Sequence, residues 1–292
     1  NFSVDRNKVK SLSNTINAIY GTNTNNTQAQ FVTKVGQPVG MITGYIAQGL
    51  FQDYKDIIGH ANQTSNSTVT VDPSTGSWVG DVKFKDVNGD GVIDQKDRVV
   101  LGNPWPKYTF GFNNFFSYKN FDLNIFITGS VGNDIVNLQK YLNSLPGSKG
   151  AYENYYASVS SFARPTSYNV ADALTATLTN PNTQVPRVFT STANGNDKLT
   201  QRNVESGTYV RMKNISLGYN LPVRWVSHLA MRGLRVAVNA QNLFTITKYT
   251  GFDPEIGPFN YYNSGNPMII NGLDNGRYPN VRMYSVNVLA DF

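Results

Sequence analysis

Apolar and polar residues alternate with a period of two along several long stretches of this 292-residue chain. The clearest are Tyr108–Tyr118, Phe121–Gly129, Leu234–Phe244 and the last twelve residues, 281–292. Tyr209–Tyr219 alternates cleanly only in its second half, and Asn1–Asp5 has the pattern of the end of a sixth stretch. Strict alternation predicts β-strands with two different faces, so the expected fold class is all-β.

The length of these strands favours a barrel that crosses a membrane. Tyr108 and Tyr118 lie on one face, ten positions apart, which is about 33 Å along a strand. A tilt of ~40° reduces this to about 25 Å, the height of the apolar band of an outer-membrane barrel, whose edges carry aromatic girdles. The alternative is a soluble sandwich, but its strands usually have only ~5–6 residues.

The connections between strands alternate in length. Lys119 and Asn120 alone join the first two strands, and Leu221–Gly233 joins two others through a predicted short amphipathic helix. The remaining connections are long, at about residues 9–106, 131–207 and 248–280. Short turns on one rim and long loops on the other are typical of outer-membrane barrels. If the last strand ends at the periplasm, all three long loops are extracellular.

Composition agrees with such a barrel and excludes other classes. Charged residues make up only 15% of the chain, against ~25% in typical soluble domains. The net charge of +6 is not gathered into a Lys/Arg cluster, so we expect no nucleic-acid partner. No apolar run reaches the roughly 20 residues of a spanning helix. Six strands cannot close a barrel around such loops, so we expect residues 1–292 to be the C-terminal segment of a larger protein.

The stretch from Asp86 to Asp97 has the ligand spacing of a calcium loop. Gly91 holds position 6, where a sharp turn is needed. The predicted calcium ligands are Asp86, Asn88, Asp90, the Val92 carbonyl, Asp94 (directly or through water) and Asp97. Position 12 is Asp rather than the usual Glu, and the preceding residues read as extended rather than helical. The alternative is a metal-free turn held by side-chain hydrogen bonds to the backbone.

Several motifs together carry a family resemblance. They are Gly80–Asp86, Gly102–Asn113, Lys119–Leu123, Gly44-Tyr45, Gly49–Phe51, Val210-Arg211, Ile215–Tyr219, Ala240–Thr245 and Asp253–Glu255. With them the chain resembles the C-terminal portion of the SusC/RagA-type TonB-dependent outer-membrane transporters of Bacteroidetes. The resemblance implies a 22-stranded barrel with an N-terminal plug, import of oligosaccharides or peptides driven by TonB, and a SusD-like lipoprotein as an external lid. The plug, the TonB-contacting segment and the earlier strands lie outside this chain.

Two further features concern partners. Phe292, with apolar residues at every second position before it, resembles the signal read by the barrel-assembly machinery, although an ordinary last strand explains the alternation equally well. Loop aromatics suit sugar stacking, or alternatively loop packing and lid contact. They include Tyr152, Tyr155, Tyr156, Phe259, Tyr261 and Tyr262.

Nothing in the sequence indicates an enzyme. His60 and His228 are isolated from acids and hydroxyl nucleophiles at motif spacing, and the chain has no Cys. Three functions therefore stay open. The first is a segment of an outer-membrane importer that faces lipid, a lid and TonB-driven machinery; the second is a passive porin or adhesin barrel. The third is a soluble, calcium-dependent glycan-binding module.

Overall fold

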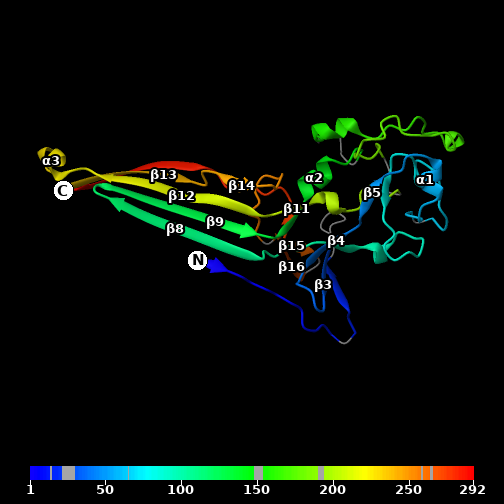
Figure 1. The fold of residues 1–292 in the computed structure, drawn as a ribbon, viewed down its shortest axis with the longest axis horizontal. Helices are drawn as coiled ribbons and strands as arrows, with labels where there is room; N and C mark the ends of the chain where they lie inside the picture. Colours follow the sequence, from blue (N-terminus) through cyan, green and yellow to red (C-terminus); the bar gives the residue numbers. More distant parts are fainter. Residues whose placement is uncertain are drawn as a thin grey trace.

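The computed structural model describes residues 1–13, 15–21, 30–64, 66–147, 154–189, 194–257, 259–263 and 266–292. One long sheet dominates the molecule and carries a second body of short strands at one end (Figure 1). The sheet is antiparallel, in the order β1-β8-β9-β12-β13-β18, with β14 paired to β12. Its strands are β1 (Phe2–Ser3), β8 (Tyr108–Tyr118), β9 (Phe121–Val131), β12 (Tyr209–Asn220), β13 (Gly233–Gln241), β14 (Thr245–Thr247) and β18 (Met283–Asp291).

Strand register aligns the apolar residues into rows across the sheet. Directly opposed residues of antiparallel strands lie on the same face. One row runs through Phe116, Leu123, Leu217, Val238 and Val286 over five consecutive strands. The alternation in the sequence therefore becomes one continuous apolar face, and the all-β prediction is confirmed.

A β-bulge explains why Tyr209–Tyr219 alternates cleanly only in its second half. The register between β12 and β9 shifts between Met212 and Asn214. An extra residue at this point moves the apolar set from even to odd positions. Met212 opposes Ile127 on one side of the bulge and Ile215 opposes Ile125 on the other, so the apolar face continues through it.

The opposite face of the sheet is mostly polar, although Phe115 and Leu289 lie on it, and it carries an ion pair across strands. Arg235 Nη2 on β13 lies 2.6 Å from Asp122 Oδ2 on β9, across the intervening strand β12. Gly218 of β12 lies beneath this pair, and a Cβ there would fall 2.4 Å from Arg235 Nη2. Glycine at this position therefore lets the two side chains meet.

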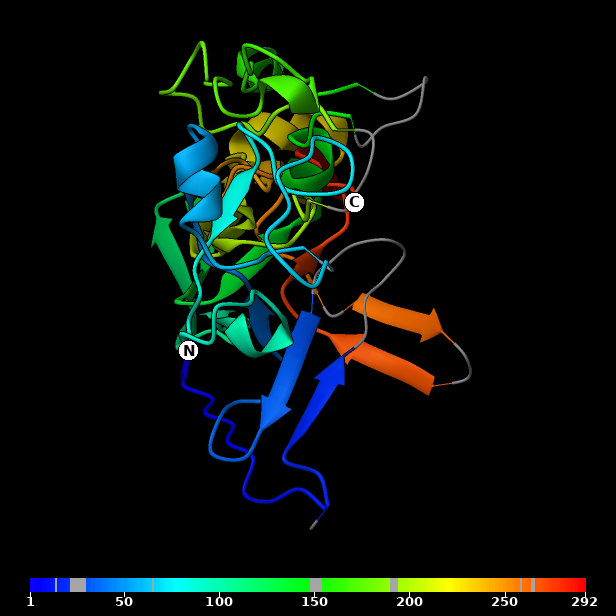
Figure 2. The same ribbon diagram turned by 90° about the vertical axis from the view of Figure 1, so that its right-hand side faces the viewer.

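The three long connections form one body, which we call the loop domain (Figures 1 and 2). Its sheets are β2-β3-β4-β7, β5-β6, β11-β10-β17 and β15-β16. The strands are β2 (Ala18–Gly21), β3 (Gln30–Lys34), β4 (Met41–Gly44), β5 (Ala47–Leu50), β6 (Val82–Phe84), β7 (Val99–Gly102), β10 (Asp134–Asn137), β11 (Val204–Ser206), β15 (Phe259–Asn263), β16 (Asn266–Ile270) and β17 (Leu273–Asp274). The helices are α1 (Tyr54–Ile58) and α2 (Leu138–Asn143), with short 3-10 turns η1 (Gln95–Asp97), η2 (Ala157–Ser161), η3 (Val170–Asp172) and η4 (Gln201–Asn203).

Two apolar cores hold the loop domain together. The larger one surrounds the fully buried Trp78 and Phe84 of the first connection. The second joins Ile42 of the first connection, Leu138 of the second and Leu273 of the third. Side chains far apart in the sequence thus share one core, and the three connections fold as one unit rather than as separate loops.

The short connections lie together at the other end of the long sheet (Figure 1). The β8–β9 hairpin turns at Lys119, whose φ of 51° is left-handed. Residues 221–232 form helix α3 (Val223–Val226) and the 3-10 turn η5 (Ser227–Leu229), where a short helix is predicted from sequence. Short and long connections therefore segregate to opposite ends. No helix among the described residues is long and apolar enough to cross a membrane.

Candidate functional site

The apolar face of the long sheet is exposed along its strands. Phe116 is 56% exposed and Val286 is 65% exposed, although both belong to the same ordered row. Exposed apolar patches of this extent mark a surface that meets protein or lipid. The polar face carries Asp122, Arg235 and Asn124 instead. The sheet thus has the two-faced chemistry of a barrel wall between lipid and a watery lumen.

The predicted calcium loop is a tight curl of backbone around its own carboxylates. Asp86 accepts N–H groups from Gly89 at 2.6 Å and from Gly91 at 2.9 Å. Asp97 accepts N–H groups from Val87 and Asp94, each at 2.8 Å. The first and last acids of the loop therefore both accept hydrogen bonds from its backbone. The turn held by side-chain hydrogen bonds, which the sequence offered as the alternative, is present in the structure.

Several properties of this loop also suit a cation. Gly91 has a φ of 81°, as the sharp turn requires. The Val92 carbonyl accepts no hydrogen bond from the described residues. The carboxylate of Asp97 is fully buried, and no Lys, Arg or His of the described chain lies within ion-pair distance of it. A buried carboxylate without a cation is costly, and calcium bound to this set of oxygen donors would relieve that cost.

Lys96 already places a positive charge beside two of the carboxylates that a cation would bind. Its Nζ lies 3.5 Å from Asp90 Oδ2 and 3.8 Å from Asp94 Oδ2. The lysine side chain is 69% exposed and therefore free to swing away. Among the described residues no three acidic or His side chains stand ready in a coordination cluster. The carboxylates would have to converge from their backbone-bonded positions to bind a metal.

A buried ion pair fastens the second long connection to the first. Arg187 Nε lies 2.6 Å from Asp81 Oδ1, and both side chains are almost fully buried. Asn194 and Asn196 each donate an Nδ2 hydrogen bond to the same oxygen, at 2.9 and 2.8 Å. The Trp78 N–H supplies the other carboxylate oxygen with a bond of 2.7 Å. The charge of Asp81 is thus fully matched, and this cluster is structural.

A second ion-pair network fastens the third connection to the sheet. Arg211 on β12 reaches Asp253 at 2.5 Å and Glu255 at 2.6 Å, and Lys213 also binds Glu255 at 2.8 Å. Asn280 donates two hydrogen bonds to Asp253 Oδ2, from its backbone N–H at 2.9 Å and its side chain at 3.0 Å. The motifs Val210-Arg211 and Asp253–Glu255, separate in sequence, are therefore two halves of one anchor.

The structure does not decide whether the loop aromatics stack on sugars. Tyr155 and Tyr156 are part-exposed on the loop domain, at 37% and 42%. Tyr152 and the side chains of Phe259, Tyr261 and Tyr262 lie outside the described residues. Sugar stacking and lid contact both stay predictions.

The two histidines have structural surroundings. His60 Nε2 lies 2.7 Å from the Phe84 carbonyl and its ring packs edge-on against Phe51. Burial is the main reason why the pKa of His60 falls below its ordinary value. His228 lies in the short turn η5 at the far end of the sheet.

The fold and these surfaces define a class: a wall segment of an outer-membrane β-barrel that carries a large folded loop domain on one rim. No family model matches the chain. It is 36% identical over 264 residues to TonB-dependent receptor P3 of Formosa agariphila, and the match covers 89% of this chain and 23% of that receptor. It is 25% identical over 211 residues to TonB-dependent receptor SusC of Bacteroides thetaiotaomicron, covering 72% of this chain and 17% of SusC.

Solved structures give the same fold. The RagAB peptide importer in its closed-closed state matches with a TM-score of 0.64 and 20% identity, over 100% of this chain and 26% of the matched chain. The chain belongs to the SusC/RagA-type TonB-dependent receptors of the outer membrane, and spans about a quarter of the relatives that it matches. The family resemblance seen in the sequence is confirmed. So is the prediction that the chain is not an enzyme, since these relatives are receptors.

Sequence reasoning missed the groups that organise the loop domain. It identified Arg211 and Asp253 only as parts of separate motifs, and it gave no role to Arg187, Lys198 or Arg202. The partners of Arg211 and Arg187 in the two ion-pair networks lie 42 and 106 residues away along the chain. Local patterns carry no signal for such pairs.

Proposed function

We propose that this chain forms part of the wall and the mouth of an active outer-membrane importer. The observation that carries the proposal is the exposed apolar row from Phe116 to Val286 on the long sheet. The other face of this sheet is mostly polar, and one end of the sheet carries the folded loop domain (Figure 1). In the complete protein the apolar face would meet lipid. The polar face would line the lumen, with the plug and the other strands supplied by the rest of the protein.

Exposure of the apolar face weighs against a soluble glycan-binding module. A soluble domain would have to cover that face, and no described element of this chain packs over it. The outer edge of β18 has no partner strand in the described chain either. Lipid tolerates no open sheet edge, so further strands of the same barrel are the natural neighbours.

Face assignment has a direct test in two neighbouring substitutions. Phe112→Arg puts a charge on the apolar face, and Asn113→Arg puts the same charge on the polar face of the same strand; both native side chains are exposed. A charge toward lipid near mid-membrane costs about 2–4 kcal/mol. We expect Phe112→Arg to lower the yield of folded, heat-modifiable barrel in the full-length protein, with Asn113→Arg near wild type. Equal yields would refute the assignment.

Cargo and energy source belong to the same proposal. The family resemblance implies an oligosaccharide or a peptide as cargo, a SusD-like lipoprotein as lid, and TonB as the motor. Among the matched proteins, RagAB is described as a peptide importer and the relatives as TonB-dependent receptors. The folded loop domain suits the lid-contacting mouth, because one core fixes all three connections at the rim. A passive porin or adhesin is the alternative.

Uptake experiments separate these alternatives. Cells that express the complete gene would be supplied with labelled oligosaccharides or labelled peptides, with and without functional TonB. Saturable uptake of one class that stops without TonB supports the importer. Uptake that continues without TonB would establish a passive pore, and copurification of the lipoprotein from wild-type cells tests the lid.

We further propose that the Asp86–Asp97 loop binds calcium and that the ion stiffens the loop domain rather than taking part in chemistry. The support is the ligand spacing, together with a Val92 carbonyl that accepts no hydrogen bond and a buried Asp97 carboxylate that meets no cation in the described part of the chain. Asp86, Asn88, Asp90 and Asp97 would supply side-chain oxygens, with Asp94 binding directly or through water. External calcium is millimolar, which suffices for a weak site.

Limited proteolysis of the purified full-length protein tests this proposal. Calcium should protect the loop from cleavage in wild type and should fail to do so in Asp90→Ala. Asp72→Ala is the matched control, because Asp72 also accepts two backbone N–H groups of a turn, at 2.7 Å each, outside the calcium loop. Its cleavage should still respond to calcium. Protection that ignores calcium in wild type would leave the metal-free turn as the explanation.

A further inference from the structure

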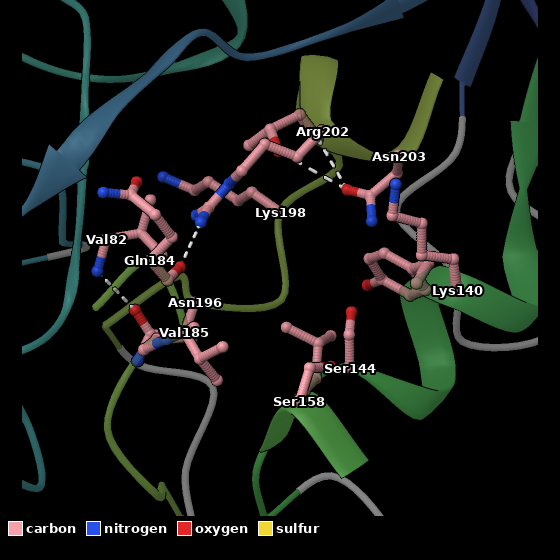
Figure 3. A pocket seen from close by; sticks show the side chains of 14 residues that line it. Val82, Lys140, Ser144, Ser158, Gln184, Val185, Asn196, Lys198, Arg202 and Asn203 are labelled. Carbon is pink, nitrogen blue, oxygen red and sulfur yellow. Dashed lines mark hydrogen bonds between the residues drawn. The ribbon is translucent and has the colours of Figure 1, made fainter. Parts of the chain in front are cut away.

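A cavity of about 200 Å³ in the loop domain has strongly basic walls. It lies between the end of α2, the 3-10 turn η2, the segment around Gln184 and the segment that leads into η4 (Figure 3). Three cations line it, Lys140, Lys198 and Arg202. We call it the Lys198 cavity.

Among the described residues, only one of the three cations has a carboxylate partner. Lys140 Nζ lies 2.9 Å from Glu205 Oε1, so its charge is matched. Arg202 Nη1 bonds the carbonyl oxygen of Gln184, as the dashed line in Figure 3 shows. Lys198 Nζ lies 3.3 Å from the Gln63 carbonyl. Within the described part of the chain, no carboxylate lies at ion-pair distance from Lys198 or Arg202.

The surroundings of Lys198 stabilise its positive charge only partly. Its Nζ lies 4.9 Å from the centre of the Tyr45 ring and 5.1 Å from that of Phe84. Such contacts contribute far less than an ion pair buried in the same place. Burial lowers the pKa of Lys198 to about 8 and is the main reason for the shift, which fits a charge without a matching anion.

Neutral hydrogen-bond donors complete the walls. Ser144 and Ser158 lie across the cavity from Arg202 in Figure 3, and neither hydroxyl has a hydrogen-bond partner among the described residues. Asn203 uses only its side-chain oxygen, which accepts from Thr200, so its Nδ2 is free to donate. Two cations without a carboxylate partner among the described residues and three neutral donors thus line a space large enough for several waters.

We propose that the Lys198 cavity binds a small oxyanion: a carboxylate, sulfate or phosphate group held by Lys198 and Arg202, with Ser144, Ser158 and Asn203 as neutral donors. The anion would bridge α2, η2 and η4, and would therefore stiffen the second long connection where it enters the loop domain. The group arrives either as a free ion or as part of an acidic cargo molecule. The proposal stands independently of which cargo the importer takes.

Calorimetry on the purified full-length protein tests the site with sulfate, phosphate and acetate against chloride at constant ionic strength. We expect sulfate or phosphate to bind to wild type, with at least a ten-fold weaker affinity in Lys198→Met and in Arg202→Gln. Lys55→Met is the matched control, since Lys55 is an exposed lysine of α1 that does not line the cavity. It removes the same charge and should bind as wild type does.

A steric variant keeps the proposal testable if the charge variants fold poorly. Ser158 is exposed at the cavity wall, so Ser158→Leu should fill the cavity while it leaves both cations in place, and binding should be lost. Absence of any oxyanion binding to wild type, or equal binding in the cavity variants and in Lys55→Met, would overturn the proposal.

A second arm distinguishes the source of the anion. Sulfated and uronate-bearing oligosaccharides and acidic peptides would be titrated beside their neutral analogues, in wild type and in Ser158→Leu. An acidic cargo that binds more tightly than the free ion, and only in wild type, identifies the site as a cargo subsite. Affinity for free sulfate alone, with no gain from an attached chain, identifies a structural ion site.

Alkaline pH should weaken the binding. As the pH rises through about 8, Lys198 loses its proton in the free protein and the cavity loses half of its unmatched charge. Asp197 and Asp97 raise this pKa and Arg98 lowers it, all less than burial does. An anion favours the protonated form, so binding near pH 8 should take up a proton, seen as a dependence of the heat on the buffer. Heat that is independent of the buffer at this pH would contradict the role of Lys198.

Discussion

Replacement of Arg211 by Met should release the third long connection from the barrel wall. Arg211 is only 3% exposed and binds two acids of that connection, Asp253 and Glu255, at 2.5 and 2.6 Å. Its Nε also donates to Thr245 at 2.8 Å. Met retains most of the aliphatic volume, so the change removes charge and hydrogen bonds without opening a large cavity.

The expected size follows from the carboxylate that is left behind. Asp253 is 6% exposed and would retain only the hydrogen bonds from Asn280 and the Glu255 N–H. Loss of one partner of a buried ion pair costs about 3–5 kcal/mol. Every 1.4 kcal/mol is a factor of ten, so the equilibrium for local opening of residues 248–280 should rise by about 10² to 4 × 10³.

Limited proteolysis of the purified full-length protein measures this opening. When opening is fast relative to cleavage, the cleavage rate follows the open population, so cuts within residues 248–280 should accelerate by a comparable factor. Arg235→Met is the matched control. This substitution breaks the ion pair between Arg235 and Asp122 on the long sheet, where the two groups lie 2.6 Å apart, far from the third connection. Cleavage within residues 248–280 should therefore stay unchanged.

A double substitution separates two effects of the single one: the unpaired buried charge of Asp253 and the lost contacts of Arg211. Arg211→Met with Asp253→Asn leaves no buried carboxylate unpaired, so it should be cleaved more slowly than Arg211→Met alone. Equal cleavage in wild type and in Arg211→Met would refute the view that this network anchors the connection. Faster cleavage in the double variant than in the single one would refute the stranded-charge argument.

Three further outcomes test other parts of the structure. Gly218→Ala should lower the thermal midpoint of the folded barrel because its Cβ would fall 2.4 Å from Arg235 Nη2, whereas Gly233→Ala meets nothing closer than 3.8 Å and should be neutral; equal midpoints would contradict this. Lys96→Gln should tighten calcium binding in a titration, since it removes a positive charge 3.5 Å from Asp90 Oδ2; weaker binding would exclude direct competition. Burial raises the pKa of Asp253, but hydrogen bonds, led by that of Arg211, outweigh burial and hold the pKa below 3.8. The ion pairs of Arg211 should therefore persist above pH 3.8 and be lost as the pH falls through the pKa of Asp253 in the folded protein. Proteolysis at acid pH measures this loss, and release of the connection already at pH 6 would refute the reasoning.

The sequence by itself determined the wall. Alternation with a period of two is a local property, so Tyr108–Tyr118 and Phe121–Gly129 revealed their two faces without any knowledge of distant partners. A slip of one residue would turn every apolar side chain to the wrong face, so the same pattern also specifies the register that aligns Phe116 with Leu123. The calcium-type spacing from Asp86 to Asp97 is local in the same sense, although spacing alone does not decide between a metal and a bonded turn.

Only the tertiary structure decided how the long connections fold. Their cores and ion pairs join residues as distant as Asp81 and Arg187, 106 positions apart. No periodicity encodes which of many charged residues will meet, because that choice depends on which segments bury each other. Burial likewise left Lys198 and Arg202 unmatched beside one cavity, a property of the assembled loop domain and not of any single segment. In this chain, the long sheet follows from local alternation, whereas the loop domain depends on long-range burial of charge.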